Sequence, residues 1–188
     1  MKKTSLVCVL TVFWFAPGCD RKPAEPPGTP AATPPSAASP GAAHSLLPDT
    51  LFVTVEPTAA REVGEVKADA AAEGAVVLRG RIGGRVEPFV KDRAIFMLAD
   101  YRMPTCRDKH GDGCPTPWDY CCEPKDELLA KTATIQIVGP DGQPLKLGLQ
   151  GQHGLEPMAE IVVSGRVASR DGGTLLINAE RIFVKKAS

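Results

Sequence analysis

Apolar and polar residues alternate with a period of two in five segments between residues 75 and 184. In the first segment Val76 and Leu78 fall on one face, whereas Arg79 and Arg81 fall on the other. Such alternation is typical of strands that bury one face. The predicted strands span residues 75–82, 94–100, 132–138, 161–167 and 174–184. The side chains expected to point into the core include Val76, Leu78, Phe96, Leu98, Ile135, Ile137, Ile161, Val163 and Ile177.

A different spacing precedes the first strand. Val63, Val66 and Ala70 recur at helical intervals among charged residues, and Gly74 follows as a stop, so residues 58–72 are predicted to form one short helix. Gly80 and Gly165 stand inside the first and fourth strands, where glycine often marks a sharp bend. Residues 169–173 end in two glycines and predict a hairpin turn between the last two strands. We therefore expect an all-β fold with a small helical content, in which five strands form a Greek-key barrel.

Four segments of this pattern resemble a known fold. Their sequences are VVLRGRI (76–82), FMLAD (96–100), IVVSGRV (161–167) and LLINAERI (175–182). They resemble the OB-fold, and specifically the bacterial OB-fold (BOF) family of small exported proteins, in which a helix precedes the first strand. The resemblance covers roughly residues 58–184 and implies an OB-fold-like barrel, but it implies no activity.

Residues 102–131 depart from that family. They lie between the second and third strands, where a simple member of the family would have only a tight turn. This insertion also resembles Cys-rich segments of uncharacterised exported proteins of planctomycete-type bacteria. Its four cysteines are Cys106, Cys114, Cys121 and Cys122. Clustered cysteines of an exported chain usually pair, and a bridge between adjacent Cys121 and Cys122 would strain the peptide between them. We expect two disulfides, each joining Cys106 or Cys114 to one of that pair.

Three other kinds of chemistry remain open for the insertion. Zinc or copper would take thiolates and an imidazole, and the candidate ligands are Cys106, His110, Cys114, Cys121 and Cys122. The chain lacks a Cys-x-x-Cys pair, however, and adjacent cysteines of an extended chain point in opposite directions. Calcium would prefer the carboxylates of Asp108, Asp112 and Asp119, although the EF-hand pattern is absent. A redox-active Cys121–Cys122 pair is the third alternative.

The amino-terminal region predicts export. Lys2 and Lys3 precede an apolar run over residues 6–15, which is too short to span a bilayer, and residues 16–19 resemble a bacterial lipobox that ends in Cys19. We expect a signal peptide at 1–19, with lipid attached to Cys19. Residues 20–50 hold eight prolines and seven alanines and predict a disordered tether, so that 51–188 form the domain. The expected location is the periplasmic side of the cell envelope, anchored to a membrane.

Composition limits the function. The chain has 22 basic and 22 acidic residues, and removing Lys2 and Lys3 with the signal leaves 20 against 22, or a net charge of −2. This balance argues against a dedicated nucleic-acid surface, although Arg79, Arg81, Arg85 and Arg166 could form a basic stripe. No catalytic motif is present, so we expect no enzyme.

The expected function is a binding or scaffold module for an envelope protein, glycan or small ligand, without a cofactor. Its candidate contact residues are Arg79, Arg81, Arg85, Trp118 and Tyr120. The alternatives are a metal-binding or thiol-redox envelope protein that uses the insertion, and a nucleic-acid-binding OB domain.

Overall fold

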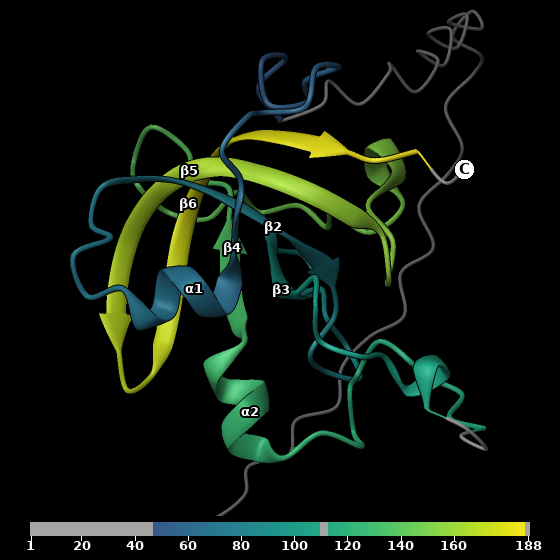
Figure 1. Ribbon diagram of the computed structural model, residues 1–188. Helices are drawn as coiled ribbons and strands as arrows, with labels where there is room; N and C mark the ends of the chain where they lie inside the picture. The colour runs from purple at the N-terminus through teal and green to yellow at the C-terminus, as the bar shows by residue number, and fades with distance from the viewer. Residues whose placement is uncertain (1–46, 110–112, 187–188) are drawn as a thin grey trace, which may run out of the picture. The chain divides into compact units, whose positions relative to one another are not determined.

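Five strands close into a ring in the computed structural model, which describes residues 47–109 and 113–186 (Figure 1). β2 (Ala75–Ile82) pairs antiparallel with β3 (Ile95–Asp100) along one edge and with β5 (Glu160–Asp171) along the other. β4 (Thr132–Gln136) joins β3 to β6 (Thr174–Val184), and β6 returns to β5. The ring order is therefore β2-β3-β4-β6-β5, closed by the β2–β5 pairing.

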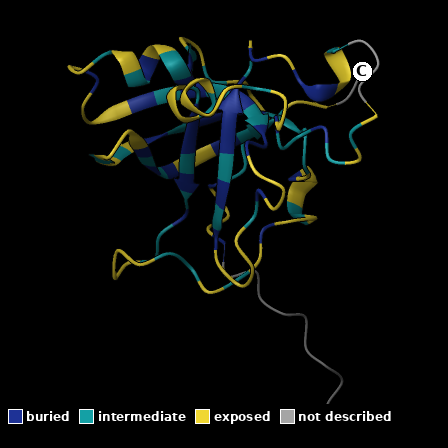
Figure 2. Cartoon of the chain, turned by 90° about the horizontal axis from the view of Figure 1, so that it is seen from below, coloured by how far each residue is buried: buried dark blue, intermediate teal, exposed yellow. Residues whose placement is uncertain are grey.

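The inner face of this ring holds the core. All nine side chains predicted to point inward are at most 9% exposed, and β2 alternates between buried and partly exposed positions along its length. Figure 2 shows that buried positions are concentrated on the strands, whereas exposed ones predominate in the loops. The predicted strand phases are therefore confirmed. The predicted all-β class with a small helical content is also confirmed. The assignment to the OB-fold stays a prediction.

Two glycines permit close approach between strands, as expected. A Cβ atom on Gly80 would stand 2.3 Å from the carbonyl oxygen of Ala99, and one on Gly165 would stand 2.3 Å from that of Asn178. The β5–β6 register also shifts between Ser164 and Gly165. These glycines let neighbouring backbones pack closely where a strand bends.

The predicted helix over 58–72 is shorter in the structure. Arg61–Glu62 form a two-residue strand, β1, parallel to β2, and α1 spans only Val63–Ala68. The carboxylate of Glu62 is buried, where it accepts hydrogen bonds from Arg79 and from the Tyr101 backbone N–H, so it fixes this segment to the barrel. Val63 and Val66 are buried as expected, but Ala70 lies beyond the helix and is exposed.

Strand and turn limits also differ from those expected. β4 ends at Gln136 instead of residue 138, and β5 continues to Asp171, so that only Gly172 and Gly173 form the hairpin turn. A short 3-10 turn, η2, spans Gln152–Gly154 before β5. Within the described residues, the helices are too short to cross a bilayer.

The Cys-rich insertion joins β3 to β4, as predicted. It contains a 3-10 turn, η1 (Cys106–Asp108), and a helix, α2 (Lys125–Ala130), that the sequence pattern did not reveal. In Figure 1 the insertion extends away from the end of the barrel at which β3 finishes.

Candidate functional site

The insertion is attached to the barrel through Tyr120. This side chain is only 1% exposed and packs with Ala99 and Met103 in a second small core, separate from that of the barrel. Next to it, the N–H of Gly84 donates to the carbonyl oxygen of Trp118 at 2.7 Å. Tyr120 was a candidate ligand contact, but its burial makes it the anchor of the insertion.

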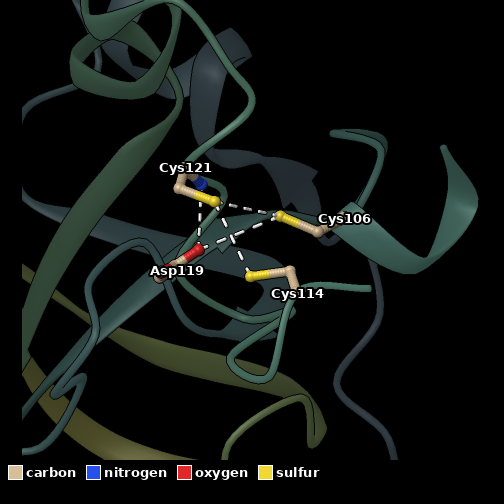
Figure 3. A group of neighbouring side chains, drawn as sticks. All are labelled: Cys106, Cys114, Asp119 and Cys121. Carbon is tan, nitrogen blue, oxygen red and sulfur yellow. Dashed lines mark hydrogen bonds between the residues drawn. The ribbon is translucent and has the colours of Figure 1, made fainter. Parts of the chain in front are cut away.

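Three thiols converge beside this anchor (Figure 3). The Sγ atom of Cys121 lies 3.8 Å from that of Cys106 and 3.7 Å from that of Cys114. Asp119 points its Oδ1 atom at the same centre, 3.9 Å from Cys106 Sγ. One ligand atom from each of these four residues lies within 4.8 Å of the others.

A turn in the backbone explains why the thiols meet. Tyr120 has a φ of 56°, in the left-handed region, and the N–H of Glu123 donates to its carbonyl oxygen at 2.9 Å. The chain is therefore not extended at Cys121 and Cys122, whose Sγ atoms are 4.0 Å apart. The argument that adjacent cysteines point in opposite directions does not apply to this turn.

Hydrogen bonds orient the carboxylate of Asp119. The Thr116 hydroxyl donates to Oδ2 at 2.9 Å, and the backbone N–H of Cys121 donates to Oδ1 at 2.9 Å. Burial disfavours the charged carboxylate, but these donors outweigh it and lower the pKa of Asp119. The residue is thus held ionised and directed at the thiols, which is how neighbouring groups orient a metal ligand.

The thiols differ in their affinity for protons. Hydrogen bonds from the backbone and side chain of Thr116 lower the pKa of Cys114. Contacts with Cys114, Asp119 and Cys106 raise the pKa of Cys121. Without a cation, Cys121 therefore holds its proton more firmly than an ordinary cysteine does.

The spacing of the four ligand atoms suits a tetrahedral ion. With zinc–sulfur bonds of about 2.3 Å, a tetrahedral zinc ion separates its sulfurs by about 3.8 Å. The two Sγ distances of Cys121, 3.8 Å and 3.7 Å, match that value. Three thiolates and one carboxylate are donors that zinc accepts, and soft thiolates also bind Cu(I).

The structure brings together only part of each predicted ligand set. It unites Cys106, Cys114 and Cys121, whereas His110 lies outside the described residues. Asp119, which the sequence suggested only as a calcium ligand, completes the group. All four insertion cysteines are thiols here, and the predicted disulfides stay a prediction.

Asp108, another predicted calcium ligand, does not belong to this group of four. The carboxylate of Asp108 accepts from the backbone N–H of Thr105 at 2.7 Å and from its hydroxyl at 2.8 Å, which closes the turn at η1. Asp112 lies outside the described residues.

The predicted basic stripe is largely neutralised. Arg79 pairs with Glu62, Arg81 lies 3.8 Å from Glu160, and Arg166 lies 2.9 Å from Glu180. Arg79 and Arg81 also contact the ring of Tyr101, with their guanidinium carbons 4.6 Å and 4.4 Å from its centre. The partners of these three arginines thus lie within the barrel domain itself. Arg85 is exposed.

A hollow of about 450 Å³ lies beside Trp118. The indole N–H donates to the carbonyl oxygen of Val86 at 2.9 Å, and the side chains of Phe89 and Pro157 also line the hollow. Val86 is 63% exposed there. Trp118 thus links this hollow to Asp119, the next residue in the chain.

The chain matches no known protein-family model and no curated protein sequence.

Proposed function

We propose that the insertion is a metal centre, in which Cys106, Cys114, Cys121 and Asp119 hold one zinc-like ion. One observation carries the proposal: the four ligand atoms lie within 4.8 Å of one another, with two sulfur–sulfur distances that a tetrahedral zinc ion requires. The barrel serves as the rigid support for this centre.

The donor set favours zinc over the other predicted metals. Calcium takes six to eight oxygen ligands, and this group offers one carboxylate among three thiols. Copper in its reduced form accepts thiolates, but the carboxylate suits a harder ion. A mixed set of three sulfurs and one oxygen therefore fits zinc best.

Elemental analysis and thiol counting on the same purified, unreduced chain test the proposal. We expect one zinc ion per chain, which protects Cys106, Cys114 and Cys121 from alkylation until a chelator removes it. Cys106→Ser should abolish stoichiometric retention, and Asp119→Ala should weaken it. A chain that retains no metal, with four cysteines in two disulfides, would contradict the proposal and support the pairing predicted from the sequence.

The hollow beside Trp118 favours a second candidate function, the ligand-binding module predicted from the sequence. Its lining combines apolar side chains such as Phe89 with charged ones such as Glu87 and Lys91, which suits a small ligand that has both apolar and polar groups. Trp118 is the sole tryptophan after residue 19, so its fluorescence reports on this hollow. A ligand that changes the fluorescence of the wild type, but does not bind Trp118→Ala, would support this function.

The proposed location in the cell envelope rests on the sequence alone, because Cys19 lies outside the described residues. Palmitate labelling of cells that express the chain tests it. Cys19→Ala should lose the label, and a label that persists in this variant would exclude lipid attachment at Cys19.

A further inference from the structure

Cys122 contacts the proposed centre without belonging to it. Its Sγ atom lies 4.0 Å from that of Cys121, while the group of four ligands consists of Cys106, Cys114, Asp119 and Cys121. A zinc site with four protein ligands is already complete, so a further thiol beside one ligand is not needed to hold the ion. Its role must be sought elsewhere, and this inference rests on the proposed metal centre.

The centre has a buried side and an exposed side. Cys106 is only 1% exposed, and its backbone N–H donates to the carbonyl oxygen of Pro117 in the anchored part of the insertion. Cys121 and Cys122 are both exposed. An ion held here is thus reached from solvent through these two adjacent thiols.

Lys109 holds the backbone at the exposed side. Its ammonium donates to the carbonyl oxygen of Cys122 at 3.1 Å and pairs with Glu123 at 2.7 Å. This contact keeps Cys122 next to Cys121, whose Sγ atom is 4.0 Å away.

We propose that Cys122 is a transfer thiol, through which the centre exchanges a thiophilic metal ion with chelating or thiolate partners. In the step, the sulfur of Cys122 binds the ion as the bond from Cys121 breaks, and the thiol proton of Cys122 passes to the released sulfur of Cys121. Ligand atoms of the partner then replace Cys122 and the remaining ligands of the centre one after another, each released thiolate takes up a proton, and the ion leaves with the partner. The charge of the ion and the oxidation state of every sulfur are unchanged. The centre thereby handles an exchangeable ion, instead of holding a permanent structural one.

The test compares the rate of zinc transfer with the amount of zinc held. Zinc-loaded wild type, Cys122→Ser and Cys122→His are mixed with excess 4-(2-pyridylazo)resorcinol, an anionic chelator that absorbs visible light when it binds zinc. Serine keeps the size of the side chain but is a poor zinc ligand, whereas histidine restores a donor. Pro124→Ala, also exposed and two residues away, is the control.

We expect Cys122→Ser to retain one zinc ion per chain but to release it on the order of tenfold more slowly, because a serine hydroxyl is a poor zinc ligand and cannot replace Cys121 on the ion. Cys122→His should recover most of the rate, and Pro124→Ala should match the wild type. Equal rates in wild type and Cys122→Ser would overturn the inference. Loss of bound zinc from Cys122→Ser would also overturn it, because Cys122 would then be a ligand. A wild type that binds no zinc would instead refute the proposed function itself.

Discussion

Gly83 leaves room for the ring of Tyr120. A Cβ atom at Gly83 would stand 3.0 Å from Cε2 of that ring and 2.5 Å from the carbonyl oxygen of Trp118. The end of β2 and the segment before Cys121 therefore pack against each other without an intervening side chain. The position of the thiol group depends on this contact, because Tyr120 directly precedes Cys121.

Gly83→Ala should displace the insertion and weaken zinc binding. Overpacking of this kind typically costs about 1–3 kcal/mol. Thermal unfolding and zinc competition measured on one sample check the result, with Gly148→Ala as control, because a Cβ atom there meets nothing within 4 Å. If Gly83→Ala binds zinc as tightly as Gly148→Ala, the barrel does not position the centre.

Tyr120 should ionise only at strongly alkaline pH. Burial raises the pKa of its phenol, although the charge of Arg81 partly opposes the effect. The fold thus favours the neutral phenol: its stabilising contribution is complete below the ordinary pKa of about 10 and is lost as the pH rises toward the folded-state value. An ultraviolet alkaline titration should show a late transition from Tyr120. Tyr120→Phe should remove that transition, and its persistence in this variant would contradict the expectation.

Two substitutions of Tyr120 distinguish the contribution of ring packing to stability from that of the hydroxyl group. Within the described residues, the Tyr120 hydroxyl has no hydrogen-bond partner. Tyr120→Phe should therefore change the free energy of unfolding little, whereas Tyr120→Ala should cost about 3–5 kcal/mol, the usual loss for a buried aromatic ring. Denaturant unfolding measures both, and equal losses would show that the hydroxyl, and not the ring, holds the insertion.

Thr116 should tune the metal affinity without touching the ion. Its hydroxyl donates to Asp119 and lies 3.7 Å from Cys114 Sγ. Thr116→Val keeps the shape of the side chain and removes this orientation, so zinc affinity should fall roughly 10–100-fold. Thr134→Val, on β4, is the matched control and should bind zinc as the wild type does. Similar affinities in the two variants would mean that Asp119 does not need Thr116 to bind the ion.

The barrel was predictable because each strand carries its own signal. The alternation around Leu78 or Ile135 reports directly which face is buried, and both side chains are fully buried. The short helices were harder, since α2 has six residues and no buried side chain. Residues 61–62 form a strand because they pair with Leu78 and Arg79 of β2, a long-range contact that local spacing does not reveal.

The set of ligands in the centre could not be predicted either, because local spacing does not show which residues the fold brings together. Its ligands follow no regular spacing, because the left-handed turn at Tyr120 and the small core with Met103 bring them together. The sequence placed Asp119 only among calcium ligands. A positive φ at a buried aromatic residue is not evident in the sequence, although it decides where Cys121 and Asp119 point.

X-ray absorption at the zinc edge tests the four-ligand centre most directly. On the reduced chain loaded with one equivalent of zinc, we predict three sulfur neighbours at about 2.3 Å and one oxygen neighbour at about 2.0–2.2 Å. Asp119→Ala should lose the oxygen neighbour contributed by the protein. A spectrum with four sulfurs, or one with zinc bound only by oxygen and nitrogen, would contradict the assignment of Cys106, Cys114, Cys121 and Asp119 as the ligands.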